Sequence, residues 1–136
     1  MFHLLIVEDE KRTREGLCRH IDWNGIGVDP VTAVAGGMEA LLAVDEIHPD
    51  ILLSDIRMPH MTGIELASII RKKFPRCKII FLSGYADKEY LMSAIELKAV
   101  NYIEKPIDLT EIRNAVAKAV VQLESELKDE LIHSGF

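Results

Sequence analysis

Five short apolar runs alternate with longer amphipathic segments, and this alternation is the feature that most constrains how the chain folds. Each run is rich in Ile, Leu or Val and mostly continuous, which is typical of strands buried on both faces of a parallel sheet. The runs cover residues 4–7, 31–35, 51–53, 78–82 and 101–103. We therefore expect five strands in one parallel sheet.

The segments between the runs have apolar residues three or four positions apart, a spacing that predicts helices. They cover residues 11–21, 38–47, 63–74, 88–97 and a last segment from Asp108 onward. A strand followed by a helix, five times over, favours a doubly wound α/β fold with right-handed crossovers and helices on both faces of the sheet. The length of 136 residues fits one domain of ordinary size.

Charge and cysteine usage exclude several classes of function. The net charge is −6, and an acidic surface repels phosphate backbones and anionic lipid, so we expect no direct nucleic-acid or membrane binding by this chain. The N-terminal sequence has no basic n-region, and no apolar segment approaches the ~20 residues that span a bilayer. Cys18 and Cys77 form no CxxC pair, which favours a reducing, cytoplasmic compartment.

Polar side chains follow four of the five predicted strands. Sites in this class of fold lie beyond the carboxyl ends of the strands, so these side chains should meet at one edge of the sheet. They are Glu8, Asp9 and Glu10 after the first run, Ser54 and Asp55 after the third, Ser83 (followed by Gly84) after the fourth, and Glu104 and Lys105 (followed by Pro106) after the fifth. Singly, each is more often ordinary turn chemistry, but their joint occurrence favours a site.

Carboxylates gathered in this way repel one another unless a cation lies among them. Mg²⁺ suits a site with few carboxylates because it keeps several waters and binds phosphoryl oxygens. An aspartate can act as a nucleophile and form an aspartyl phosphate, while a metal, a lysine and a hydroxyl neutralise the transferring group. The sequence therefore predicts phosphoryl transfer to a carboxylate.

Four segments carry a resemblance to a known family. They are Leu-Ile-Val-Glu-Asp-Glu at 5–10, Asp-Ile-Leu-Leu-Ser-Asp-Ile-Arg-Met-Pro at 50–59 with Gly63 following, Phe-Leu-Ser-Gly at 81–84, and Tyr-Ile-Glu-Lys-Pro at 102–106. In this order and spacing they resemble the receiver domains of bacterial response regulators, over about residues 4–121. The resemblance implies a flavodoxin-like sheet with strand order 2-1-3-4-5. It also implies a signalling switch rather than an enzyme with turnover, phosphorylated by a sensor histidine kinase.

The resemblance assigns a role to each site residue. Asp55 is the expected phosphoacceptor, and Ser83 and Lys105 are expected to contact the phosphoryl group. The expected Mg²⁺ ligands are Asp9, Asp55, the backbone carbonyl of Arg57 and, directly or through water, Glu8, which stands where the family usually has Asp. Tyr102 matches the family's aromatic switch residue. The Lys105–Pro106 peptide is expected to be cis, and Gly63 to allow a tight turn.

A narrower resemblance concerns the subgroup of receivers that precede an AraC-type helix-turn-helix output domain. It rests on Ile-Asp-Trp at 21–23, the segment 54–59 and Ser-Gly-Tyr at 83–85. Such an output domain is absent from this sequence, so DNA binding would belong to a longer parent protein.

The C-terminal segment continues the last helical pattern, and we expect a receiver domain over 1–121 followed by a helical extension or linker over 122–136. Apolar residues recur three or four apart at Val116, Val120, Leu123, Leu127 and Leu131. This spacing fits either a short seam of a homodimer or an exposed helix leading to an output domain. The two alternatives stay open.

Two rival functions are weaker. A haloacid-dehalogenase-like phosphatase would use Asp55 as nucleophile, but such enzymes usually carry a second Asp two residues later, where this chain has Arg57. A pseudo-receiver that acts only as a scaffold has no need of Asp9, Asp55, Ser83 and Lys105 together.

Overall fold

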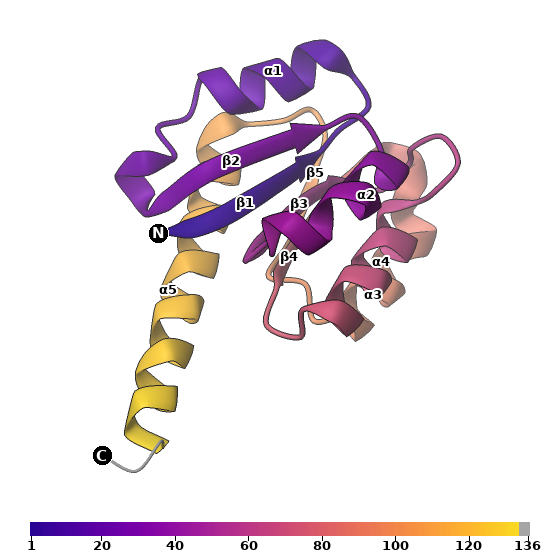
Figure 1. Cartoon of the computed structure of the whole chain (residues 1–136). Coiled ribbons are helices and arrows are strands. Elements are labelled where there is room, and N and C mark those ends of the chain that lie inside the picture. Colours follow the sequence, from indigo (N-terminus) through magenta and orange to yellow (C-terminus); the bar gives the residue numbers. More distant parts are fainter. Residues whose placement is uncertain (134–136) are drawn as a thin grey trace.

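The structure, a computed structural model, describes residues 1–133 and contains one five-stranded parallel sheet (Figure 1). The strands are β1 (Phe2–Val7), β2 (Val28–Val34), β3 (Ile51–Asp55), β4 (Lys78–Ser83) and β5 (Asn101–Glu104). Their order is β2-β1-β3-β4-β5 and every neighbouring pair is parallel, which confirms the expected fold. β1, β3 and β4 occupy the centre, so their carboxyl ends form the middle of one sheet edge.

Helices cover both faces of the sheet (Figure 1). They are α1 (Lys11–Arg19), α2 (Gly37–Ile47), α3 (Gly63–Lys73), α4 (Leu91–Glu96) and α5 (Leu109–His133), with 3₁₀ turns η1 (Asn24–Ile26) and η2 (Tyr85–Tyr90). α1 and α5 pack on one face and α2, α3 and α4 on the other. Right-handed crossovers between parallel strands require this division.

The central strands are apolar throughout because both of their faces are buried. In β1, Leu4 and Ile6 belong to the cluster under α1 and α5, whereas Leu5 and Val7 belong to the cluster under α2 and α3. All four side chains are fully buried. Burial of one such side chain stabilises the fold by about 1.5–3 kcal/mol. The continuous runs of the sequence thus report a two-sided core.

The segment after β4 differs from the expected helix over residues 88–97. Its first part is the 3₁₀ turn η2, and α-helical geometry begins only at Leu91. The cause is local: Gly84 N donates to Asp87 Oδ2 at 2.6 Å, and Asp87 N donates back to Gly84 O at 3.1 Å. This reciprocal pair closes a tight turn at the carboxyl end of β4.

α5 packs on the core over its first half and projects beyond the body over its second (Figure 1). Asp108 Oδ1 caps it by accepting from Thr110 N at 2.8 Å. The last buried side chain of α5 is Leu123. Val116, Val120 and Leu123 fill this chain's own core. A seam between two copies, one of the two alternatives, would therefore be shorter than the apolar spacing suggested.

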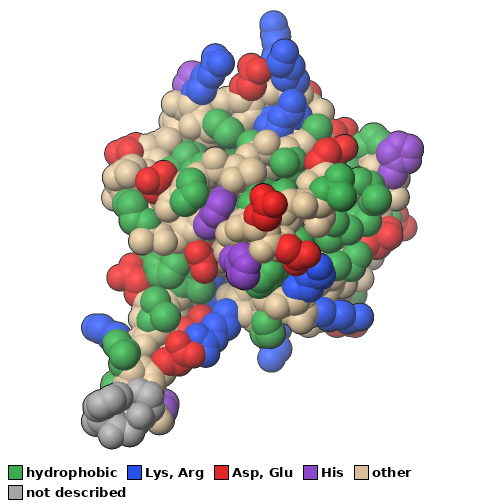
Figure 2. Space-filling model, viewed as in Figure 1, with side chains coloured by type: hydrophobic (Ala, Val, Ile, Leu, Met, Phe, Trp, Pro, Cys, Tyr) green, Lys and Arg blue, Asp and Glu red, His purple; other side chains and the backbone are tan. Residues whose placement is uncertain are grey.

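Charged groups are unevenly spread over the surface in Figure 2. Lys and Arg side chains gather over α1 at the top of that view, although the chain as a whole is acidic. Within residues 1–133, α5 is long but too polar to cross a bilayer, and the shorter helices do not qualify either.

Candidate functional site

Three carboxylates meet at the carboxyl ends of β1 and β3. Val7 pairs with Ser54 in the sheet, so the residues that follow them, Glu8 and Asp55, lie on adjacent strands at the same level. One carboxylate oxygen each from Glu8, Asp9 and Asp55 lies within 4.8 Å of the others. Glu8 and Asp55 are buried, whereas Asp9 is exposed. The grouping expected from the sequence is confirmed.

Lys105 supplies the positive charge of this cluster. Its Nζ donates to Asp55 Oδ2 at 2.9 Å and lies 3.4 Å from Glu8 Oε1. The backbone N of Lys105 donates to Ser83 O at 2.8 Å, which ties the loop after β5 to the end of β4. The Lys105–Pro106 peptide is cis, as the resemblance implied.

The buried charges shift the pKa values of the cluster. Burial, reinforced by the negative charge of Asp55, raises the pKa of Glu8 from 4.5 to about 7. Burial also raises the pKa of Asp55, although its hydrogen bond with Lys105 opposes that shift. Partial burial lowers the pKa of Lys105, but its hydrogen bond and ion pairs with the carboxylates outweigh this and leave the pKa raised. In the absence of a cation, the site therefore holds more negative charge than one lysine balances.

The donor set fits a hard divalent cation. Glu8 Oε1 is buried and accepts no hydrogen bond from residues 1–133, while Glu8 Oε2 accepts from Glu10 N at 3.2 Å. Lys105 Nζ, at 3.4 Å, is shared with Asp55. A buried carboxylate oxygen without a hydrogen bond is costly, and a metal ion would satisfy it. Asp9 also lines a cleft of about 240 Å³ between the start of α2 and the loop after β3, which gives the cluster access to solvent.

Ser83 and Asp55 fit a phosphoryl group. Asp55 Oδ1 accepts from Ile56 N at 3.0 Å and Oδ2 accepts from Lys105, so both carboxylate oxygens are held in place. The Ser83 hydroxyl is buried and has no hydrogen-bond partner in the described part of the chain. Ser83 also lines a hollow of about 130 Å³ together with Tyr102 and Lys105. An acceptor placed beside Asp55 would satisfy this hydroxyl.

The structure confirms that a Cβ atom is unwelcome at Gly63, although the reason is not a left-handed turn. Gly63 is the first residue of α3, not part of a tight turn, and its φ is not left-handed. A Cβ atom at this position would overlap the carbonyl oxygen of Asp55, and Gly63 N donates to Ile56 O at 2.7 Å. Glycine is needed because the start of α3 lies directly against the backbone of the acceptor residue.

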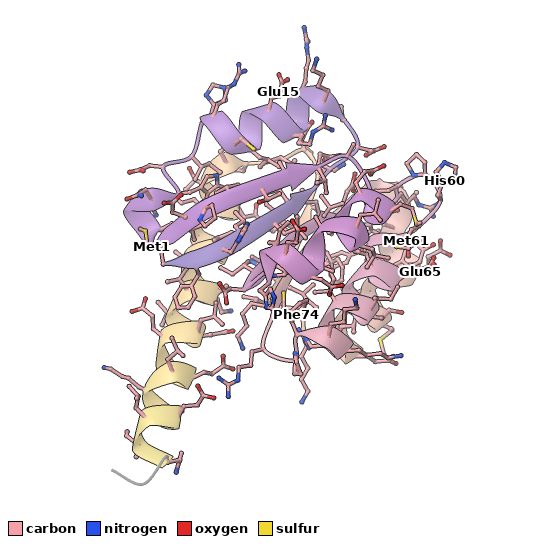
Figure 3. All side chains as sticks on the ribbon, in the orientation of Figure 1. Met1, Glu15, His60, Met61, Glu65 and Phe74 are labelled. Carbon is pink, nitrogen blue, oxygen red and sulfur yellow. The ribbon has the colours of Figure 1, made fainter. Side chains whose placement is uncertain are left out.

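The loop between β3 and α3 forms the rim of the site. Figure 3 shows His60 at its outer tip, with Met61 and Glu65 at the start of α3. Met58 is buried, and Met61 packs closely against Gly37 at the start of α2. The two methionines that flank the acidic cluster therefore serve packing.

A second polar cluster lies behind the site, and no sequence pattern predicted it. Arg57 Nε donates to Asp87 Oδ1 at 2.5 Å, and Tyr102 Oη donates to the carbonyl oxygen of Asp87 at 2.9 Å. Asp87 is almost fully buried. It had been indistinguishable from the neighbouring surface acids in Tyr-Ala-Asp-Lys-Glu-Tyr at 85–90, and only its position three residues after Gly84 hinted at a capping role.

A doubly wound parallel sheet with three carboxylates, a lysine and a hydroxyl at its carboxyl edge defines a receiver-like α/β domain. Residues 4–117 match the family model of the response regulator receiver domain. Because this match covers most of the chain, the chain belongs to the response regulator receiver domain family.

Relatives and solved structures agree with this assignment. The chain is 32% identical over 120 residues to the transcriptional regulatory protein HptR of Staphylococcus aureus, covering 88% of this chain and 47% of that protein. An uncharacterized response regulatory protein of Staphylococcus epidermidis is 32% identical over 140 residues, covering all of this chain and 55% of its own length. The chain thus spans about half the length of these curated relatives.

Two solved structures superpose closely. The two component transcriptional regulator AraC from Clostridium phytofermentans is 41% identical with a TM-score of 0.80, covering 93% of this chain and 99% of that one. The REC domain of AraT, a response regulator from Geobacillus stearothermophilus, is 36% identical with a TM-score of 0.86, covering 93% and 98%.

Proposed function

We propose that Asp55 accepts a phosphoryl group from a sensor histidine kinase and that this charge switches the conformation of the domain. The observation that carries the proposal is the arrangement around Asp55, with Lys105 on one carboxylate oxygen, two further carboxylates within 4.8 Å, and the unpaired hydroxyl of Ser83 nearby in the fold. Family membership supplies the class of partner.

In this proposal the Asp55 carboxylate attacks the phosphorus, and the bond to the donor's leaving group breaks as the new oxygen–phosphorus bond forms. Lys105 stays charged and pairs with a phosphoryl oxygen, while the Ser83 hydroxyl donates a hydrogen bond to another. Glu8, Asp9, Asp55 and the backbone carbonyl of Arg57 would hold Mg²⁺. When bound, Mg²⁺ neutralises the charge of the transferring group.

The chain completes its own phosphorylation and loses the phosphoryl group slowly, and in this sense it is a switch rather than a turnover enzyme. A phosphatase of the haloacid-dehalogenase type needs an acid/base carboxyl two residues after the nucleophile. Arg57 occupies that position, and its guanidinium is engaged by Asp87 and Glu89. Continuous turnover therefore lacks a proton donor at the place where such enzymes have one.

We further propose that the parent protein is a cytoplasmic transcriptional regulator whose DNA contacts come from an AraC-type output domain beyond this chain. Similar proteins named as transcriptional regulators support this. The coverage of only about half the length of the curated relatives supports it as well. The receiver would occupy residues 1–121. Residues 122–136 would connect it to the output domain, with residues 134–136 lying outside the described part of the chain.

Intact mass spectrometry after incubation with acetyl phosphate and Mg²⁺ tests the phosphorylation proposal. We expect one phosphoryl group, a gain of about 80 Da, on the native chain and none on Asp55→Asn. Omitting Mg²⁺ should suppress the gain. An unmodified native chain that binds Mg²⁺ would favour the scaffold function, and continuous release of phosphate would favour the phosphatase.

A further inference from the structure

We propose that Asp87 is a positioning residue that couples the acceptor loop to Ser83 and Tyr102 through its ion pair with Arg57. This inference rests on the proposed phosphorylation of Asp55 and deepens it. It assigns a path by which a phosphoryl group on Asp55, at the end of β3, changes the conformation of η2, which follows β4.

Asp87 contacts three separate parts of the domain. Its Oδ1 accepts from Arg57 Nε at 2.5 Å, which links it to the loop two residues beyond Asp55. Its Oδ2 accepts from Gly84 N at 2.6 Å, one residue beyond Ser83. Its backbone carbonyl accepts from Tyr102 Oη at 2.9 Å, on β5. A single residue thus joins the acceptor loop, the end of β4 and the aromatic side chain.

The two acidic partners of Arg57 differ greatly in burial. The Asp87 side chain is 3% exposed, whereas the Glu89 side chain, 2.8 Å from Arg57 Nη2, is 64% exposed. A buried carboxylate is strongly dependent on its cation, while an exposed ion pair contributes little. Arg57 also lies against the ring of Tyr90, with 5.7 Å from Cζ to the ring centroid. Arg57 Nη2 also donates to the Ala86 carbonyl oxygen at 3.2 Å. Asp87 therefore supplies the buried charge, although not the sole contact, that holds the guanidinium on η2.

The two carboxylate oxygens of Asp87 have different partners, Arg57 for Oδ1 and Gly84 N for Oδ2, so Asp87 couples the acceptor loop to the end of β4. A displacement of the acceptor loop moves Arg57, and the Arg57–Asp87 pair carries that displacement to the turn that fixes Gly84. Ser83 is the residue directly before Gly84, so it moves with that turn. Tyr102 Oη is hydrogen-bonded to the Asp87 carbonyl oxygen, so the tyrosine side chain moves with Asp87. Coupling between sites requires an element of this kind, whose arrangement both sites bias.

Asp87→Asn tests the coupling because asparagine keeps the shape but has one oxygen where aspartate has two. We expect Asp87→Asn to accept the phosphoryl group at a rate within about twofold of the native rate. The shift of the Tyr102 ring resonance on phosphorylation, followed by NMR, should fall to less than about half of the native shift. Glu89→Gln is the matched control, since it removes the negative charge of the other carboxylate that pairs with Arg57. It should respond like the native chain.

Arg57→Gln and the double variant Arg57→Gln/Asp87→Asn complete a cycle that does not depend on one variant folding well. If the ion pair carries the coupling, the double variant responds no less than either single variant. Additive losses, a native-like shift in phosphorylated Asp87→Asn, or an equal loss in Glu89→Gln would each overturn the inference. A native chain that takes no phosphoryl group would instead overturn the proposed function, so the two failures are distinct.

Discussion

At the scale of single residues, the charge balance of the site depends on Glu8. Its carboxylate is fully buried, one of its oxygens lacks a hydrogen bond within residues 1–133, and Lys105 is shared with Asp55. The protonated form of Glu8 is consequently favoured in the folded, metal-free chain, and the pKa of Glu8 rises to about 7. A bound cation would reverse this preference.

The pH dependence of stability follows from that shift. Below pH 4.5 Glu8 is protonated in both the folded and the unfolded chain. Between pH 4.5 and about 7, Glu8 releases its proton in the unfolded chain but keeps it in the folded chain. The free energy of unfolding therefore falls as the pH rises through this range. The loss is about 3 kcal/mol at 1.36 kcal/mol per pKa unit, and it is complete above pH 7. Urea unfolding with a chelator at pH 5 and pH 8 measures it.

Glu8→Gln is the control for this prediction, because glutamine has the same shape and does not titrate. Its stability should change less between pH 5 and pH 8 than that of the native chain. Mg²⁺ should stabilise the native chain more at pH 8 than at pH 5, since the metal competes with the proton. A native chain whose metal-free stability is equal at the two pH values would contradict the argument.

At the scale of elements, α5 has two halves with different energetics. Up to Leu123 it contributes buried side chains to the core under α1. Beyond that point two ion pairs tie it to the body, Lys78 with Glu126 at 2.7 Å and Arg76 with Glu130. The Arg76–Glu130 pair is exposed on both sides and is worth about 0–1 kcal/mol. The Lys78–Glu126 pair is partly buried, with the Lys78 side chain 17% exposed, so solvent screens it less. The second half therefore adds little to the stability of the domain.

Two truncations test where the domain ends. A chain ending at residue 125 keeps Leu123 and should lose about 2 kcal/mol, from one exposed and one partly buried ion pair. A chain ending at residue 121 also loses the burial of Leu123, which should lower the free energy of unfolding by a further ~1.5–3 kcal/mol. Urea midpoints of the two chains give the difference. Equal midpoints would support the boundary after residue 121, whereas a lower midpoint for the chain ending at residue 121 would place Leu123 inside the folded domain.

At the scale of the whole molecule, the strand–helix alternation was enough to predict the sheet and the edge at which the site lies. Strands such as β1 are buried on both faces, so their continuous apolar runs are unambiguous, and parallel strands bring their carboxyl ends together. The burial of Asp87 was not predictable, because it depends on Arg57 crossing from another loop. The same holds for Leu123, whose spacing fits a core position and a seam between copies equally well.

The exposed apolar side chains indicate where phosphorylation would change assembly. On α4, Met92 and Ile95 are 65% and 58% exposed and three positions apart, so they share one face directly after η2. On the part of α5 beyond Leu123, Leu127 is 47% exposed but lies beyond the core and far along the chain from η2. A change transmitted through Asp87 reaches α4 first, because η2 leads into it.

We therefore predict that the unphosphorylated chain is a monomer and that phosphorylation on Asp55 promotes a homodimer through α4. Size-exclusion chromatography with light scattering should show the shift in the native chain. Ile95→Lys should abolish the shift by placing a charge in the apolar face, whereas Leu127→Lys should leave it intact. Both variants should still accept the phosphoryl group. Loss of the dimer in Leu127→Lys alone would return the interface to the last helix, where the apolar spacing of the sequence had suggested it.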